Sequence, residues 1–204
     1  PRAAIFAGFW CLTLAGNLGV FLALDVVTFY VAFAAVSLAA WFLVVHDRTG
    51  AALAAGRIYI VIALAGEVCL LVGLLIGARA ADAVAIAEVR AALGGSGGGG
   101  AVAVALLTIG FGIKAGLVPL HVWLPLAHPA APVPASAVLS GAIVKAGLAG
   151  MLLVLPEGAV GPVLIGLGLA GAYGAALWGL TQRNPKAVLA YSTISQMGLM
   201  VMLV

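Results

Sequence analysis

Residues 112–147, GIKAGLVPLHVWLPLAHPAAPVPASAVLSGAIVKAG, decide the fold of this chain because two lysines lie inside very apolar runs. The segment between Lys114 and Lys145 holds two histidines and five prolines. A stretch that only filled a lipid bilayer would carry leucine at both lysine positions. The prolines predict a broken helix, and ionisable residues beside a broken helix are typical of an ion site in membrane transporters.

The composition excludes an ordinary soluble domain. The chain is 65% hydrophobic and 7% charged, whereas globular proteins carry about 25% charged residues. The net charge of +3 is small and scattered, which argues against nucleic acid as a partner. Cys11 and Cys69 lie within apolar runs, where they resemble small apolar side chains rather than a disulfide. The chain opens at Pro1 without a signal peptide and stops at Val204 within an apolar run, so we expect a piece of a longer membrane protein.

Apolar runs of about 20 residues recur along the chain, and such runs cross about 30 Å of hydrocarbon as helices. Because lipid offers the backbone no hydrogen-bond partners, helices are strongly favoured over an open sheet. We therefore predict an all-α integral membrane protein with about seven transmembrane helices, one of them broken. The expected spans are Ala3–Leu24, Val26–Val45, Ile58–Ala78, Ala101–Leu120, Pro134–Leu155, Val160–Leu180 and Ala187–Val204.

The longest expected connection covers residues 79–100. Its first part, ARAADAVAIAEVRAAL, predicts a short amphipathic helix on the membrane surface, and the GGSGGGG after it has the composition of a flexible linker. If the loops alternate between the two sides, the positive-inside rule places the more basic side and the N-terminal end in the cytoplasm. That side collects Arg2, Arg48, Arg57, Arg183 and Lys186. The expected membrane is a bacterial inner membrane.

Three ionisable side chains lie well inside expected spans. A charge at the bilayer centre costs about 2.5–3.5 kcal/mol on insertion scales. A lysine near a helix end can carry its ammonium to the interface, but Lys145 is near the middle of its span, and Lys114 is also deep. Since burial favours the neutral form, a buried lysine can exchange a proton near neutral pH. Glu67 is the expected partner of one lysine; the alternative is a glutamate hydrogen-bonded to a neighbouring helix.

Further polar residues are candidates for a proton path. His121 and His128 could relay protons, and the alternative for each is an interfacial loop histidine. No ligand spacing joins them to His46, so no metal site is predicted. The last span carries a polar helix face that can hold water or bind helices together. Its members are Ser192, Ser195 and Gln196.

The run KAGLVPLHVWLPLAHPAAPVPASAVLSGAIVKAG, with NPKAVLAYSTISQMG further along, resembles the antiporter-like membrane subunits. These occur as L-, M- and N-type subunits of respiratory complex I, in Mrp-type cation/proton antiporters and in membrane-bound nickel–iron hydrogenases; HPAAP followed by SGAIVK is most similar to the hydrogenase branch. The resemblance implies a fourteen-helix fold with two inverted five-helix repeats. Residues 1–155 would be the first repeat, and residues 156–204 the truncated start of the second.

By the same resemblance, Lys114 matches the broken-helix lysine and Lys145 the central lysine of the next helix. The family's partner glutamate is missing, because Ala34 stands at its position in TFYVAFAAVSLAAW. We hypothesise that Glu67 replaces it from the following helix. The acid that commonly follows WLP in the family is Leu126 here.

Together these features predict a proton-translocating membrane subunit of a redox-driven complex, of the NADH-quinone oxidoreductase or membrane-bound hydrogenase type. No cofactor is expected, since the sequence offers neither iron–sulfur cysteines nor a nucleotide loop. The expected partners are other membrane subunits, the lipid bilayer and protons, with Na⁺ as an alternative ion. Two alternatives remain open: a Mrp-type Na⁺/H⁺ antiporter subunit and a structural membrane module that does not pump.

Overall fold

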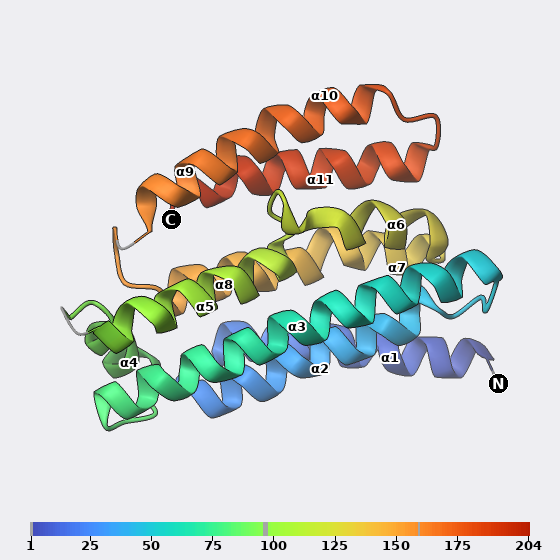
Figure 1. Ribbon diagram of the computed structural model, residues 1–204. Helices are drawn as coiled ribbons and strands as arrows, with labels where there is room; N and C mark the ends of the chain where they lie inside the picture. Colours follow the sequence, from blue (N-terminus) through green and yellow to red (C-terminus); the bar gives the residue numbers. More distant parts are fainter. Residues whose placement is uncertain (1, 96–97, 159) are drawn as a thin grey trace.

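The computed structural model describes residues 2–95, 98–158 and 160–204, and within these ranges the chain is helical, with a single isolated β-bridge. This confirms the predicted all-α fold (Figure 1). The α-helices are α1 (Arg2–Leu22), α2 (Val26–Val44), α3 (Gly50–Ala81), α4 (Ile86–Leu93), α5 (Gly98–Ala115), α6 (Trp123–Ala130), α7 (Val133–Val138), α8 (Val144–Val154), α9 (Gly161–Leu169), α10 (Ala175–Leu180) and α11 (Pro185–Val201). Shorter helical turns are η1 (Leu120–Val122) and the π-helical turns η2 (Leu139–Ile143) and η3 (Ala170–Gly174).

In the part of the chain that the structure describes, six helical stretches are long and apolar enough to cross a membrane. They are α1, α2, α3, α5 to α6, α7 to α8 and α9 to α10, the last two being continuous through η2 and η3. The remaining helix, α11, has 17 residues, or about 25 Å at 1.5 Å per residue, and runs beside α9 and α10 (Figure 1). The helices therefore fit the predicted architecture, with its one broken helix in the α5–α6 stretch.

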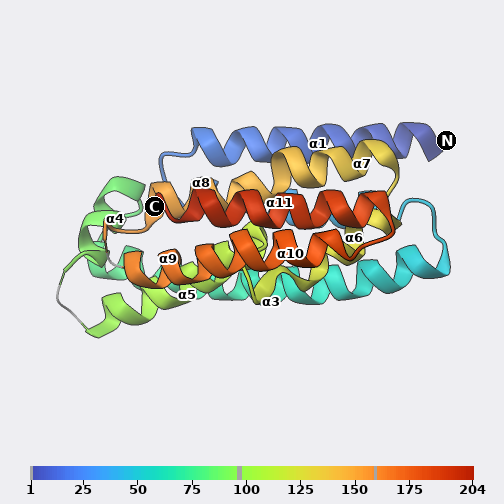
Figure 2. The ribbon, with the colours of Figure 1, turned by 90° about the horizontal axis from the view of Figure 1, so that it is seen from above.

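The helices lie side by side in three tiers. Figure 1 shows α1, α2 and α3 in one tier, α5 to α8 in the middle and α9 to α11 in the third, and Figure 2 shows α1 and α3 at opposite edges of the bundle. The connections α2–α3, α6–α7 and α10–α11 lie at the same end as the N-terminus, and the connections α1–α2 and α3–α4 lie at the opposite end (Figure 1). The break between α5 and α6 lies between the two ends. The connections thus alternate between the two ends of the bundle, as the predicted orientation assumed.

The third span differs from the prediction at its N-terminal end. It was expected to begin at Ile58, but α3 begins at Gly50 and runs for 32 residues, about 48 Å and longer than the hydrocarbon is thick. Thr49 caps the helix by accepting a hydrogen bond of 3.1 Å from the backbone N–H of Ala52. Arg57 therefore lies on the exposed surface of a helix rather than in a loop.

The connection expected over residues 79–100 is shorter than predicted. Its first residues belong to α3, its amphipathic helix is α4, and α5 already begins at Gly98. Residues 96 and 97 of the expected linker lie outside the described residues. Helix α4 packs against α3, α5 and α8 at one end of the bundle and buries Ile86, Val89 and Leu93. An ion pair of 3.2 Å from Arg90 to Glu157 adds a contact to the α8–α9 connection.

A tight hairpin joins α1 and α2, and Asp25 is its key residue. Its carboxylate accepts hydrogen bonds from the backbone N–H groups of Thr28 (2.8 Å) and Val27 (3.0 Å), which caps α2. These donors hold the pKa of the Asp25 carboxyl below its ordinary value. The same turn pairs with the α3–α4 connection through two backbone hydrogen bonds of 2.9 Å.

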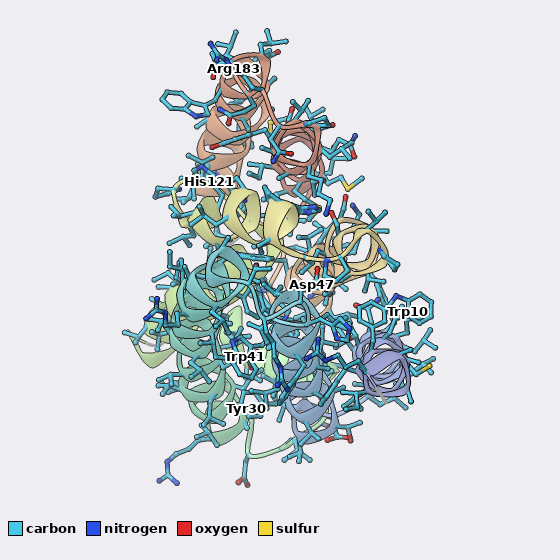
Figure 3. All side chains as sticks on the ribbon, turned by 90° about the vertical axis from the view of Figure 1, so that its right-hand side faces the viewer. Trp10, Tyr30, Trp41, Asp47, His121 and Arg183 are labelled. Carbon is cyan, nitrogen blue, oxygen red and sulfur yellow. The ribbon has the colours of Figure 1, made fainter. Side chains whose placement is uncertain are left out.

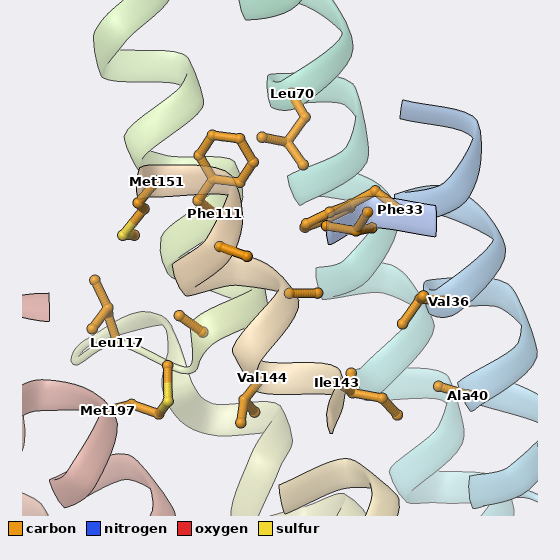
Figure 4. Packing of buried hydrophobic residues seen from close by; sticks show 14 of the residues in the cluster. Phe33, Val36, Ala40, Leu70, Phe111, Leu117, Ile143, Val144, Met151 and Met197 are labelled. Atoms are coloured by element: carbon orange, nitrogen blue, oxygen red, sulfur yellow. The ribbon is translucent and has the colours of Figure 1, made fainter. Parts of the chain in front are cut away.

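Aromatic side chains fill the centre of the bundle between α2 and α5. The rings of Phe29, Phe33 and Phe111 lie with their centroids 5.7–5.9 Å apart. Figure 4 shows Phe33 and Phe111 with Leu70 of α3 and Met151 of α8 around them. Helices α2, α3, α5 and α8 thus share one apolar core, and the lysines are placed by helices that pack in it.

Helices α5 and α8 approach so closely at Gly147 that a side chain has no room there. A Cβ atom at this position would lie 2.6 Å from the backbone nitrogen of Ala115 and 2.7 Å from the carbonyl oxygen of Phe111. Real Cβ atoms do not pack so close to backbone, so any side chain would push the helices apart. Gly147 therefore sets the spacing between the two lysine-bearing helices.

We predict that Gly147→Ala destabilises the full-length protein by about 1–3 kcal/mol, the usual cost of overpacking a core. Unfolding in mixed detergent micelles measures this change. Gly141→Ala is the matched control, because a Cβ atom there meets nothing within 4 Å, and its effect should stay within about 0.5 kcal/mol. Equal stability of the two variants would contradict this account of the α5–α8 contact.

Candidate functional site

The break after α5 places Lys114 at the end of a half-helix. Gly116 adopts a left-handed conformation, with φ of +71°, and its N–H donates to the carbonyl of Ile113 at 3.2 Å. The N–H of Leu117 reaches back to the carbonyl of Gly112 at 2.9 Å. These two bonds form a Schellman motif, which ends a helix and favours glycine. Lys114 lies in the last turn of α5, where the helix dipole favours a cation.

The prolines contribute to this break unequally. Pro119 lies in the break itself, as predicted. Pro125, another of the five prolines that predicted a broken helix, lies instead in the first turn of α6, where a missing N–H costs little. Trp123, at the start of α6, donates a hydrogen bond of 2.7 Å from its indole nitrogen to the carbonyl of Ile113. The second half-helix is thereby tied to the end of the first.

Three buried polar side chains from three helices meet beside this break. Glu67 comes from α3, Ser37 from α2 and Lys114 from α5, and their exposed fractions are 6%, 2% and 4%. The Lys114 ammonium donates a hydrogen bond to Oγ of Ser37, and the Ser37 hydroxyl donates to Oε1 of Glu67. A carboxylate and an ammonium are thus joined through a hydroxyl group in an apolar core, an arrangement that can pass a proton.

The surroundings of this Glu67–Ser37–Lys114 cluster are apolar and aromatic. Nζ of Lys114 lies 4.8 Å from the centroid of the Phe33 ring, which favours the cation. The Tyr59 hydroxyl donates a hydrogen bond of 3.0 Å to the carbonyl of Ser37. The cluster lines a cavity of about 10 Å³, room for about one water molecule. Oε2 of Glu67 is buried, and none of the described residues offers it a hydrogen bond.

The structure brings two of the predicted residues, Glu67 and Lys114, together but adds a third that the sequence did not reveal. Ser37 was overlooked because a serine in an apolar helix commonly bonds its own backbone. The available signal was its spacing from Ala34, since residues three apart lie on the same face of a helix. The contact to Ser37 also fits the alternative in which Glu67 simply bonds a neighbouring helix.

Lys145 lies apart from this cluster, in the middle of the α7–α8 stretch. Its ammonium donates a hydrogen bond of 3.1 Å to the carbonyl of Ser140, which lies in the π-helical turn η2. A π-turn disturbs the regular helical hydrogen-bond ladder and is frequent at functional sites. The Ser140 hydroxyl in turn lies 2.7 Å from the hydroxyl of Thr193 in α11. The half-buried Lys145 therefore stays at mid-span instead of extending to the interface.

The two histidines occupy different places. His128 is buried in α6, with Nδ1 at 2.7 Å from Oγ of Ser136, so it is not an exposed loop residue. His121 lies beside the α9–α11 tier (Figure 3) and lines a groove with Tyr191 and Trp178. Within the described residues, no hydrogen bond connects either histidine to Glu67, Lys114 or Lys145.

The polar face predicted on α11 is divided in the structure. Ser195 donates a hydrogen bond of 2.7 Å to the carbonyl of Ala172 in η3, and so joins two helices, the commoner use of such a face. Ser192 and Gln196 are exposed, with 3.5 Å between Nε2 of Gln196 and Oγ of Ser192.

Residues 23–204 match the family described as NADH:quinone oxidoreductase/Mrp antiporter, TM. The chain belongs to this family. It is 35% identical over 184 residues to hydrogenase-4 component B of Escherichia coli, a match that covers 86% of this chain and 27% of that protein. The family assignment makes the chain an integral membrane protein, in agreement with its long apolar helices.

Two solved structures share its fold. A chain of respiratory complex I from Thermus thermophilus superposes with a TM-score of 0.83 and 26% identity, over 97% of this chain and 44% of that one. A chain of the Mrp complex from a Dietzia species superposes with a TM-score of 0.86 and 28% identity, over 94% of this chain and 22% of that one. The chain thus spans less than half the length of these relatives.

Proposed function

We propose that this chain is part of a proton-translocating membrane subunit of a redox-driven complex, in which protons move through buried lysines. The observation that carries the proposal is the Glu67–Ser37–Lys114 cluster, a titratable pair joined through a hydroxyl in a membrane-spanning core. Ionisable groups inside a membrane are expensive and are retained mainly for function. Similarity to a hydrogenase component and to a complex I chain supports a redox-driven parent complex.

In this mechanism Glu67 and Lys114 form the first proton-exchange site, and Lys145 receives the proton next. A change in a neighbouring subunit would alter the field on the Glu67–Lys114 pair and release the proton toward Lys145. Lys145 then passes it toward α11. The Lys145 ammonium contacts the backbone carbonyl of Ser140, and the hydroxyl of the same serine lies beside that of Thr193 in α11. We assign His121 and His128 to the ends of this route. The polar residues on α11 would line it beyond Lys145; they are Ser192, Ser195 and Gln196.

The domain division and the orientation belong to the same proposal. Residues 1–155 form the first antiporter-like repeat, and residues 156–204 begin the second. The end of the bundle that carries Arg48, Arg183 and Lys186 faces the cytoplasm, as the positive-inside rule predicts. The separate tier formed by α9 to α11 supports a boundary between α8 and α9.

A second candidate is a subunit of a Mrp-type Na⁺/H⁺ antiporter, which the similarity to the Mrp complex favours. Sealed inverted vesicles that contain the full-length protein with its partner subunits can separate the two. Electron transfer is started with NADH or hydrogen, and acidification of the interior is followed with a pH-sensitive dye. We expect acidification in sodium-free buffer that a protonophore abolishes. Acidification that requires a sodium gradient would replace the proposal with Na⁺/H⁺ antiport. If no acidification occurred in any condition, the chain would be part of a structural membrane module.

A further inference from the structure

We propose that Ser37 is a proton-relay residue, whose hydroxyl carries the proton between Lys114 and Glu67. Its Oγ atom is the shared partner of the ammonium and the carboxylate. Among the described residues, the only direct ion pair joins Arg90 and Glu157. Lys114 and Glu67 are therefore connected through the Ser37 hydroxyl rather than by direct contact. This inference rests on the proposed function and specifies how its first site works.

A serine hydroxyl suits this position because it donates one hydrogen bond and accepts up to two. It accepts from the Lys114 ammonium and donates to Glu67 at the same time. A second acceptor, the carbonyl of Phe33, lies 3.4 Å from Oγ. When Glu67 is protonated, the hydroxyl can turn to that carbonyl and accept a hydrogen bond from the acid. The same residue can thus serve both protonation states of Glu67.

The transfer step moves two protons by one bond each. A proton leaves Nζ of Lys114 for Oγ of Ser37, while the proton already on Oγ moves to Oε1 of Glu67. One N–H and one O–H bond break, and two O–H bonds form, so that an ammonium–carboxylate pair becomes an amine and a carboxylic acid. The serine is unchanged, no electrons are transferred and no co-reactant is needed.

The packing around Ser37 makes the hydroxyl hard to replace. Tyr59 holds its backbone carbonyl at 3.0 Å, and the adjoining cavity, about 10 Å³ in volume, admits about one water molecule. A side chain that fills the position without a hydroxyl therefore interrupts the relay and leaves little space for additional water. Valine and threonine have nearly the same shape and differ in one hydroxyl group, which makes them the decisive pair.

The test compares Ser37→Val and Ser37→Thr in the full-length protein within its complex, at equal assembly in sealed vesicles. We expect Ser37→Thr to retain proton translocation and Ser37→Val to lose it by about 100-fold or more, in line with the usual contribution of a positioned proton-transfer group. Thr108→Val is the control, because among the described residues the partner of that hydroxyl is the carbonyl of Val104 in its own helix, at 2.7 Å. It should translocate protons like wild type.

Ser37→Ala removes the hydroxyl without adding volume, so it keeps the test decisive if the extra methyl group impairs assembly. Translocation at the wild-type rate by Ser37→Val or by Ser37→Ala would overturn the relay. Glu67→Gln, measured in parallel, separates this failure from that of the proposed function. If Glu67→Gln is inactive while the serine variants are active, only the relay is wrong; if all are active, the proposed function fails as well.

Discussion

Glu67→Gln is expected to abolish proton translocation by the parent complex, with a loss of about 100-fold or more. Glutamine keeps the size of the side chain and can still accept the hydrogen bond from Ser37, but it cannot take up or release a proton. The measurement is the initial rate of acidification in sealed vesicles, divided by the rate of electron transfer. Electron transfer itself should continue, since Glu67 lies in the membrane-spanning helix α3.

Assembly has to be measured together with this rate. Removal of one of two buried opposite charges can cost about 3–5 kcal/mol, the usual value for a broken buried ion pair, because the Lys114 ammonium is left without a compensating charge. Glu88→Gln is the matched control, since it makes the same substitution on the exposed face of α4, and it should act like wild type. Normal translocation by an assembled Glu67→Gln complex would end the hypothesis that Glu67 replaces the glutamate missing at Ala34.

Lys145→Ala is expected to have an effect of similar size. The ammonium lies at mid-span, where Ser140 supplies its protein hydrogen bond, so alanine removes the site that receives the proton after Lys114. Lys145→Arg should fail as well, because arginine keeps the positive charge but does not release its proton in proteins. Loss of proton translocation in both variants would show that this position requires a side chain that can release its proton, and not merely a positive charge.

Most of the fold follows from the lengths of the apolar runs. The bilayer imposes helices of a defined length, so the positions of α1, α2 and the α7–α8 stretch could be read directly from the sequence. The start of α3 was misplaced because the alanine-rich residues 50–57 continue the helix beyond the hydrocarbon, and Thr49 was the overlooked cap. The π-turns were also missed, since one extra residue in a turn hardly changes the hydrophobic periodicity.

The charged residues of the candidate site could be predicted from the sequence, but the serine that connects them could not. Glu67 and Lys114 are conspicuous because ionisable residues are costly in apolar helices. The role of Ser37 depends on the rotation and spacing of three packed helices, and the sequence of one helix does not contain that information. The end of α5 at Gly116 could have been predicted from the sequence, because a glycine after a helical run is a common C-cap signal.

The most direct test of proton translocation through the buried lysines is the pH gradient formed at equal assembly by wild-type and Lys145→Ala complexes. Arg183→Ala, in the exposed α10–α11 connection (Figure 3), serves as the control and should match wild type. We predict that Lys145→Ala transfers electrons and forms no gradient. An unchanged gradient in this variant would contradict the account, because it would make the lysine structural.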